Sequence, residues 1–198
     1  MRLLVATRNP HKLGEIESIL RMPGLALTNM GEFPLMPEVI EDGDTFEANA
    51  TKKALETCRF TGMWTLADDS GLEVRALGWA PGVFSARYAG EPVDYEANNR
   101  KLLRELRGVE DRSARFRCVI ALASPDGACR TVEGICRGRI AEAESGAGGF
   151  GYDPLFTPDG GTRTFAQMAA GEKNGVSPRG RALQAAAAAW RSLLLQSR

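Results

Sequence analysis

The 198-residue sequence predicts an α/β protein whose mixed β-sheet is flanked by helices. Short apolar runs that suit buried strands alternate with stretches that repeat apolar residues at helical spacing. The order strand, helix, strand, helix, strand is followed by a hairpin and further helices, which indicates a mixed sheet. No repeat or linker interrupts the chain, and its length suits one domain, so we expect residues 1–198 to form a single domain.

The N-terminal part of the chain predicts two strands around one helix. Residues 3–6 are a short apolar run of the kind found in buried strands. Asn9 is a favourable N-cap and Pro10 suits the first helical position, so a helix is expected from there to about Arg21. Residues 25–28 are expected to form the second strand.

The middle of the chain predicts a second helix and a third strand. This helix is expected to begin at Asp44 or Thr45, both good capping residues, and to end near Phe60. Residues 65–67 are expected to form a strand that ends at the turn Asp68-Asp69-Ser70-Gly71.

The second half predicts an ordered loop, a helix and a hairpin. The loop spans residues 78–90 and the helix spans residues 94–106. Residues 115–124 and 129–137 are expected to pair across the turn Pro125-Asp126-Gly127. After a glycine-dense loop, a last helix is expected from the Ser177-Pro178 start to about Leu195.

Charge and composition exclude several classes of protein. Lysine plus arginine and aspartate plus glutamate both number 25, so the net charge is zero and the basic footprint of a nucleic-acid binder is missing. No apolar run approaches the ~20 residues that span a bilayer, and the first apolar run is too short for a signal peptide. We therefore expect a cytoplasmic protein with no nucleic-acid partner and no membrane partner.

The cysteines and the histidine do not suggest a metal site. No C-x-x-C pair and no nearby histidine accompany the four cysteines, which are Cys58, Cys118, Cys129 and Cys136. Reduced thiols are therefore expected instead of zinc ligands. The single histidine, His11, is expected to be exposed at a helix start, and most Ser–His–Asp and Cys–His schemes are excluded unless it is the base.

Two lysines occupy helix positions that are unfavourable for a cation, one in the first turn and one on an inward-pointing face. Lys12 lies in the first helical turn, where a cation opposes the dipole, but a strand–loop–helix start can bind phosphate with its amides and a lysine together. On the second helix, Asn49 and Lys53 share the face of Phe46, which should point inward. The alternatives are a solvated Lys12 and a Lys53 whose stem snorkels to water.

Asp68 and Asp69 are candidate ligands of a hard metal ion. They follow a predicted strand, and strand ends are where ligands bind in α/β sheets. Because adjacent strand residues point to opposite faces, only one of them need face a ligand. Mg²⁺ takes one or two carboxylates and completes its shell with phosphate and water. A second carboxylate could come from Glu38, Glu41 or Asp42; the alternative is an ordinary Asp-Ser-Gly turn.

The stretch Gly148-Gly149-Phe150-Gly151-Tyr152-Asp153 is unusual in flanking an aromatic residue with glycines. Such glycines allow close approach of the backbone to a ligand, or they accommodate a strained turn. Phe150 could stack on a planar base, or it could close the core. Lys173, Arg179 and Arg181 gather around the last helix start and need a negative or carbonyl-rich partner, or else solvation.

Taken together, these segments resemble the inosine triphosphate pyrophosphatase family over essentially the whole chain. The matching motifs, in order, are Ala6-Thr7-Arg8-Asn9 with Lys12 and Glu15; Thr45-Phe46, Asn49-Ala50 and Lys53-Ala54; and residues 67–72, 80–88, 148–154, 172–174 and 177–183. The resemblance implies an elongated fold with two lobes around a central nucleotide-binding cleft, and a homodimer. It also implies Mg²⁺-dependent hydrolysis of ITP, dITP and XTP to the monophosphate and pyrophosphate.

The resemblance also implies roles for individual residues. Glu41 and Asp69 match the metal-binding carboxylates, and Asp69 matches the proton acceptor for the attacking water. The matched substrate-binding positions are Thr7, Arg8, Asn9, Lys12, Asn49, Lys53, Ser70, Phe150, Gly151, Tyr152, Asp153, Lys173, Pro178 and Arg179. Thr7 to Lys12 and Lys53 correspond to the triphosphate grip, and Phe150 to Asp153, Lys173 and Arg179 correspond to the base pocket.

One position departs from the family pattern and two other functions compete. Pro178 stands where the family usually has histidine before Arg179, so a base contact made by that histidine does not carry over. A phosphatase or pyrophosphatase for another nucleotide, such as a modified pyrimidine triphosphate, is the nearest alternative. A regulatory module that binds nucleotide without turnover is the other, and the acidic pair Glu41 and Asp69 argues against it.

Overall fold

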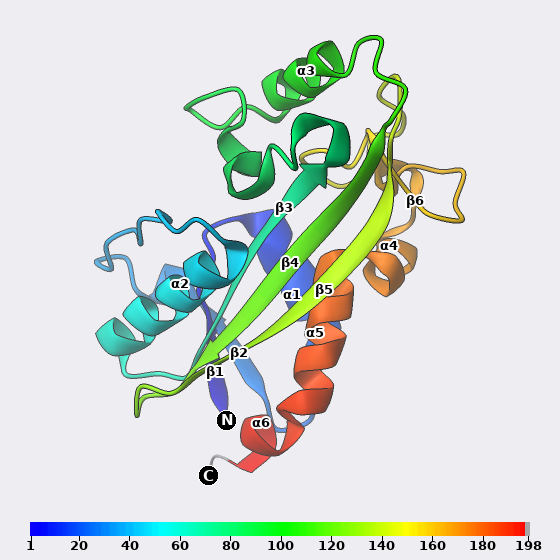
Figure 1. The fold of residues 1–198 in the computed structure, drawn as a ribbon. Coiled ribbons are helices and arrows are strands. Elements are labelled where there is room, and N and C mark those ends of the chain that lie inside the picture. Colours follow the sequence, from blue (N-terminus) through cyan, green and yellow to red (C-terminus); the bar gives the residue numbers. More distant parts are fainter. Residues whose placement is uncertain (197–198) are drawn as a thin grey trace. The chain divides into compact units, whose positions relative to one another are not determined.

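The computed structural model describes residues 1–196 and contains one mixed six-stranded sheet, ordered β2-β1-β3-β4-β5-β6 (Figure 1). The strands are β1 (Arg2–Val5), β2 (Ala26–Asn29), β3 (Thr65–Val74), β4 (Ser113–Ala123), β5 (Cys129–Ile140) and β6 (Phe156–Pro158). β1 pairs in parallel with β2 and with β3, whereas β5 and β6 are antiparallel. The predicted α/β fold with a mixed sheet is confirmed.

Six α-helices and four short 3₁₀ helices join these strands in the described part of the chain. The α-helices are α1 (Pro10–Ile19), α2 (Phe46–Thr61), α3 (Tyr95–Glu105), α4 (Ala170–Val176), α5 (Pro178–Ala189) and α6 (Arg191–Gln196). The 3₁₀ helices are η1 (Met30–Glu32), η2 (Arg75–Leu77), η3 (Gly82–Arg87) and η4 (Phe165–Gln167). No helix of residues 1–196 combines the length and the apolar character needed to cross a membrane.

The chain forms two compact units, each with its own apolar core. Unit 1 comprises residues 1–69, 118–134 and the chain from Arg179 onward, and unit 2 comprises Ser70–Arg117 and Ile135–Pro178. The core of unit 1 includes Leu3, Val5, Ile16, Leu20, Leu66, Ile120, Leu183 and Trp190. The core of unit 2 includes Leu72, Val74, Leu102, Leu106, Tyr152, Leu155, Phe156 and Phe165.

The predicted helix starts are confirmed where a capping residue was identified. The side chain of Asn9 accepts hydrogen bonds from the amides of His11 and Lys12, at 2.9 and 3.3 Å, and Pro10 is the first residue of α1. Thr45 is the N-cap of α2, since its hydroxyl accepts from the amide of Ala48 at 3.1 Å. Local capping chemistry therefore determines both helix starts.

The prediction that the third strand ends at residues 68–71 is wrong. β3 continues to Val74, so Asp68 and Asp69 lie within the strand and not in a turn. Leu72 and Val74 maintain the two-residue alternation of buried apolar side chains beyond the acidic pair. The strand tolerates Asp68 in its interior because two cations neutralise this carboxylate.

The chain beyond β3 differs from the prediction in four places. The predicted loop 78–90 contains η3, and the final helix is divided at Trp190 into α5 and α6. α4 and the three-residue strand β6 were not predicted, because neither is long enough to show a hydrophobic period. The predicted hairpin is confirmed: the amide of Ser124 donates to the carbonyl of Ala128 at 2.9 Å across the turn between β4 and β5.

The four cysteines are free thiols, as expected, and Cys58, Cys118 and Cys136 are buried. Burial raises the pKa of the Cys118 thiol to about 12, so this group stays protonated at neutral pH. Cys118 packs in the core of unit 1 and Cys136 in the core of unit 2.

Candidate functional site

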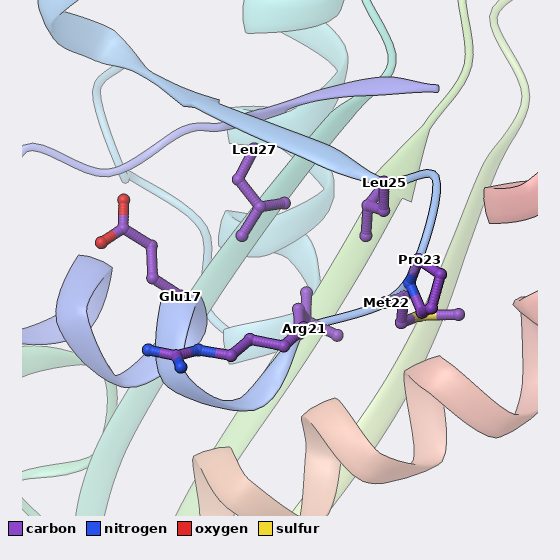
Figure 2. Close-up of a pocket in the computed structure, with 7 residues that line it drawn as sticks. Glu17, Arg21, Met22, Pro23, Leu25 and Leu27 are labelled. Atoms are coloured by element: carbon purple, nitrogen blue, oxygen red, sulfur yellow. The ribbon is translucent and has the colours of Figure 1, made fainter.

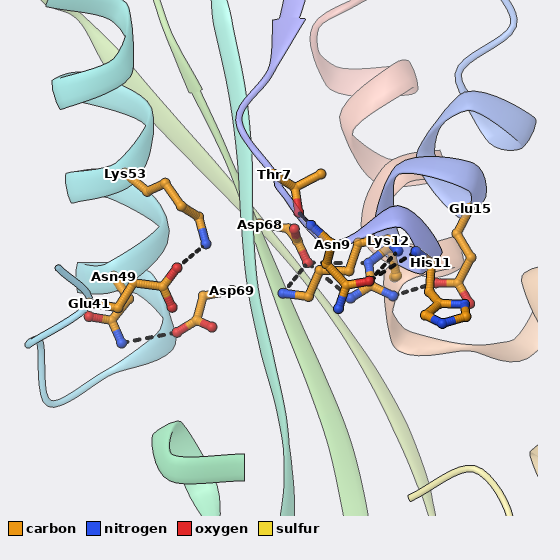
Figure 3. A network of polar contacts seen from close by, with 11 residues as sticks. Thr7, Asn9, His11, Lys12, Glu15, Glu41, Asn49, Lys53, Asp68 and Asp69 are labelled. Atoms are coloured by element: carbon orange, nitrogen blue, oxygen red, sulfur yellow. Dashed lines mark hydrogen bonds and ion pairs between the residues drawn. The ribbon is translucent and has the colours of Figure 1, made fainter. Parts of the chain in front are cut away.

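Asp68 and Asp69 contact different partners on opposite sides of β3. Asp68 forms ion pairs with Lys12 of α1 at 3.1 Å and with Arg179 of α5 at 3.0 Å. Asp69 accepts a hydrogen bond from the side-chain amide of Asn49 of α2 at 3.0 Å (Figure 3). The prediction that the two neighbouring carboxylates face different surroundings is confirmed, as the alternation of side chains along a strand requires.

A buried ion cluster surrounds Asp68. Its carboxylate is fully buried; Arg179 donates to it through two nitrogens and also pairs with Glu15. Burial alone would raise the pKa of Asp68, but the charges of Lys12 and Arg179 outweigh burial and lower it. Burial lowers the pKa of Lys12, but the nearby negative charges, chiefly those of Asp68 and Asp69, together outweigh burial and raise it. Lys12 therefore carries its charge at the start of α1, where the sequence had suggested an anion site.

Asp69 belongs to a second cluster, in which one further carboxylate and two lysines act on it. Burial raises the pKa of Asp69 to about 6; Lys12 and Lys53 counteract this, while the nearby charge of Glu41 adds to it. Lys53 forms an ion pair with Glu41, and its side chain is only 13% exposed. The inward face of α2 is confirmed: Phe46, Asn49, Ala50 and Ala54 are buried.

The pair Glu41 and Asp69 suits a hard divalent cation. Each carboxylate lies within the electrostatic reach of the other, so a cation bound by both would relieve their repulsion. Of the three candidates Glu38, Glu41 and Asp42, Glu41 is the one whose charge acts on Asp69, so it is the companion that the structure favours. No group of three or more histidine, cysteine, aspartate or glutamate residues suited to a metal occurs in residues 1–196.

Hydrogen bonds within the segment and to the backbone of Met36 hold the chain between β1 and α1. The Thr7 hydroxyl accepts from the amide of Asn9 at 3.2 Å, and the Arg8 guanidinium donates to the carbonyl of Met36 at 2.8 Å. His11 is exposed, as expected. The side chain of Asn9 already caps the amides of His11 and Lys12 at the start of α1.

In unit 2, Lys173 contacts part of the residue group that the resemblance assigns to the base pocket. We call residues 148–153 the aromatic loop. The Asp153 carboxylate accepts from the amide of Phe150 at 2.9 Å and from the ammonium of Lys173 at 2.6 Å. The Lys173 nitrogen lies 5.2 Å from the centre of the Phe150 ring, which is a cation–π distance. Phe150 is half-buried, so it is not a plug of the core.

The glycines of the aromatic loop permit close contacts within the protein itself. Gly149 and Gly151 have φ angles of +72° and +62°, which side chains rarely adopt. A Cβ atom at Gly149 would lie 2.0 Å from the Asp153 carboxylate, and one at Gly148 would lie 2.9 Å from the carbonyl oxygen of Ala166. The strained-turn alternative thus explains these glycines without a ligand.

We predict that Gly149→Ala disrupts the aromatic loop. The new methyl group would displace the Asp153 carboxylate, which holds both Phe150 and Lys173, and the positive φ adds strain. We expect a loss of about 2–4 kcal/mol in the free energy of unfolding, measured by urea denaturation. Gly160→Ala is the control, because φ there is +77° but no atom lies within 4 Å of the new Cβ. Equal losses in both variants would show that the Asp153 clash is unimportant.

The remaining predicted positions are distributed over both units. Ser70 follows Asp69 on β3 and is half-buried, and Tyr152 donates from its hydroxyl to the carbonyl of Ser85 at 2.8 Å. Pro178 is buried at the first position of α5. Arg179 belongs to unit 1, where it contacts Asp68 and Glu15, and Lys173 belongs to unit 2.

The sequence reasoning missed two buried asparagines, Asn98 and Asn99 of α3. Their side chains hold two different loops by hydrogen bonds to the backbone. The signal was present in the spacing, because Asn98 and Asn99 fall on the face of α3 that also carries the buried Leu102.

One surface pocket lies apart from the predicted residues. It is open and mostly apolar, and lies between the C-terminal end of α1 and β2 (Figure 2). Its lining residues are Glu17, Leu20, Arg21, Met22, Pro23, Leu25 and Leu27. None of the predicted site residues takes part in it.

Comparison with known proteins identifies the family of the chain. The sequence model described as the Ham1 family matches residues 3–189. The chain belongs to the Ham1 family. Two relatives with the name dITP/XTP pyrophosphatase come from Desulforamulus reducens and Geobacter sulfurreducens. They are 53% identical over 188 residues (94% of each chain) and 53% identical over 184 residues (92% of each chain).

Solved structures of Ham1 proteins share the fold. The Ham1 protein of Staphylococcus aureus has a TM-score of 0.89 and 36% identity, covering 98% of this chain and 100% of that one. A nucleoside-triphosphatase (dITP/XTP pyrophosphatase) of Mycobacterium abscessus has a TM-score of 0.78 and 47% identity, covering 93% of this chain and 98% of that one. The Ham1 similarity therefore includes both units.

Proposed function

We propose that this chain hydrolyses non-standard purine nucleoside triphosphates, namely ITP, dITP and XTP, to the monophosphate and pyrophosphate. The observation that carries the proposal is the identity of 53% over 94% of the chain with a relative named dITP/XTP pyrophosphatase. The site geometry supports it, since a buried carboxylate with a raised pKa lies among two lysines and a second carboxylate. This combination suits water activation beside a polyanion.

Unit 1 carries the residues proposed for the triphosphate. Lys12 and Lys53 would stabilise the negative charge of the leaving pyrophosphate, as cations do in phosphoryl transfer. Asp69 would accept the proton of the water that attacks the α-phosphorus, and Asn49 orients Asp69 through its hydrogen bond. Thr7, Arg8 and Asn9 shape the segment that presents Lys12.

Glu41 and Asp69 are the residues proposed to hold Mg²⁺. When bound, Mg²⁺ would neutralise phosphate charge and lower the pKa of a bound water. Lys53 keeps Glu41 in place by their ion pair, so the carboxylate is oriented before the cation arrives. The buried position of Asp69 limits competition from bulk water.

The residues proposed for the base belong mainly to the aromatic loop. Phe150 offers a half-buried ring for stacking, and the Lys173 ammonium could donate to a 6-oxo group but could not accept from a 6-amino group. A site that leaves a buried donor unpaired with adenine discriminates strongly against it. By resemblance, Gly151, Tyr152, Asp153, Arg179 and Ser70 complete the substrate contacts, and Pro178 replaces a usual histidine.

We further propose that the whole chain acts as one catalytic domain, as a homodimer and in the cytoplasm. Each unit contains some of the residues to which the family resemblance assigns catalytic, metal-binding or substrate-binding roles. Size-exclusion chromatography with light scattering tests the homodimer, because a dimer doubles the 21.4 kDa of the chain.

The decisive test of the function is a substrate panel. We expect the purified protein with Mg²⁺ to release pyrophosphate from ITP, dITP and XTP at least about 10²-fold faster, as kcat/KM, than from ATP. GTP and modified pyrimidine triphosphates complete the panel. Release of orthophosphate, or binding without turnover, would contradict the proposal and favour another phosphatase or a regulatory module.

We predict that Lys53→Ala weakens ITP binding more than it destabilises the fold. Loss of a charge-assisted contact should raise the KM for ITP about tenfold or more, whereas the melting temperature should change little because α2 packs through its apolar residues. Lys52→Ala is the matched control, since Lys52 is the neighbouring lysine of α2 and pairs with Asp42 on the surface. An unchanged KM with a large loss of melting temperature would indicate a structural role for Lys53.

A further inference from the structure

Two adjacent asparagines occupy the buried face of α3, where an amphipathic helix normally carries apolar residues. Asn98 and Asn99 are 1% and 4% exposed, and the neighbouring Leu102 is fully buried. A buried polar side chain lowers stability unless hydrogen bonds satisfy it. The two asparagines differ sharply in how well this condition is met.

Asn98 is fully satisfied and holds the segment that contains η3. Its amide nitrogen donates to the carbonyl of Ala86 at 2.9 Å and, at 3.4 Å, to that of Ser85. Its oxygen accepts from the amide of Ala89 at 2.6 Å. Asn98 is therefore a structural residue, because both of its polar atoms bind the backbone of one segment.

Asn99 is only half satisfied. Its amide nitrogen donates to the carbonyl of Gly151 in the aromatic loop at 3.2 Å. Its side-chain oxygen is buried and has no hydrogen-bond partner within residues 1–196. Gly151 itself is half-exposed, so water could satisfy its carbonyl without Asn99. Stability alone does not explain an asparagine here, since leucine has a similar size and no unpaired oxygen.

The same face of α3 contacts the aromatic loop a second time. Tyr95 precedes Asn99 by one helical turn, and its ring centre lies 6.1 Å from that of Phe150. The loop is thus fixed to α3 at Phe150 and at Gly151, and to Lys173 through Asp153. Of the two α3 contacts, only that of Asn99 is directional, because a hydrogen bond sets the orientation of the peptide that follows Gly151.

We propose that Asn99 is a positioning residue for the substrate base: its bond to Gly151 orients the aromatic loop, and so sets the KM for ITP and the preference for 6-oxo purines. This inference rests on the proposed function, because that function assigns the base to the aromatic loop. Asn99 does not touch the base in this scheme. Its effect passes through the backbone between Phe150 and Tyr152.

The test compares Asn99→Leu with Asn98→Leu, a matched change one position away. For Asn99→Leu we expect a KM for ITP raised roughly fivefold to tenfold, a kcat within about twofold of wild type, and a lower ratio of kcat/KM for ITP over ATP. Its melting temperature should stay the same or rise, because the unpaired oxygen is removed. Asn98→Leu should lower the melting temperature and leave the KM within about twofold. If Asn99→Leu does not fold, Asn99→Ala is measured in its place with the same expected KM.

Amide hydrogen exchange of the free protein provides a readout without substrate. Asn99→Leu should speed exchange in residues 148–153, and Asn98→Leu should speed it in residues 85–89. A normal KM and unchanged exchange in Asn99→Leu, with an active wild type, would overturn the inference. A KM raised equally by both variants would overturn it too. Faster exchange in Asn99→Leu together with a wild type that does not hydrolyse ITP would instead contradict the proposed function.

Discussion

Asp69→Asn is expected to lower kcat for ITP by at least about 10³-fold, the largest effect on activity that we predict. Asparagine has no charge to offer a cation, and its amide does not accept a proton from water at neutral pH. The hydrogen bond from Asn49 can persist, because the new side chain retains an oxygen acceptor. Pyrophosphate release under saturating ITP and Mg²⁺ measures the loss. Turnover close to that of wild type would remove Asp69 from the mechanism.

The same variant should be at least as stable as the wild type when divalent metal is removed. Burial raises the pKa of Asp69 to about 6 from an ordinary value of 3.8, so the folded protein holds the ionised form at a cost of about 1–3 kcal/mol above pH 6. A raised carboxyl pKa stabilises the fold below the unfolded value and loses that stabilisation as pH rises through 6. The gain in melting temperature of Asp69→Asn over wild type, measured in EDTA, should therefore be largest above pH 7 and vanish below about pH 4.

Local patterns were sufficient to predict the sheet class, the first two helix starts and the hairpin. Asn9 and Thr45 cap their helices by bonds to residues two or three positions away, so the sequence contains both partners. The course of β3 could not be predicted in this way. Its continuation through Asp68 depends on Lys12 and Arg179, which lie 56 and 111 positions away along the chain and meet Asp68 only after folding.

The site, like the fold, was predictable where the signal is local and unpredictable where it depends on distant residues. The sequence singled out Lys12, Lys53 and Asp69 as residues in unfavourable surroundings, and the structure shows the charges that surround each of them. The support of the aromatic loop was missed, since the bond between Asn99 and Gly151 joins segments that are distant in the sequence. The spacing of α3 marks Asn99 as a buried polar residue, but it cannot identify Gly151 as its partner, because every residue has a carbonyl.

Asp68→Asn is expected to cause the largest loss of stability among the substitutions considered. The variant would keep the shape of the side chain but remove the one full negative charge that both Lys12 and Arg179 contact. Removing one partner of a buried ion cluster leaves charge uncompensated and costs about 3–5 kcal/mol. Glu15 would still pair with Arg179, so Lys12 is left with the greater deficit. For a chain of 198 residues this corresponds to a melting temperature lower by roughly 10 °C.

The matched control for Asp68→Asn is Asp42→Asn. Asp42 also pairs with a lysine, Lys52, but its side chain is 64% exposed, so solvent screens the pair and its loss should leave the melting temperature nearly unchanged. The effect of Asp68→Asn should also depend on pH. The charges of Lys12 and Arg179 hold the pKa of Asp68 below its usual value despite burial, so its stabilising effect is complete above pH 4 and fades only at lower pH. If both variants melted within a degree or so of wild type, the buried cluster would contribute little to the fold, and charge alone could not explain why β3 continues past Asp68.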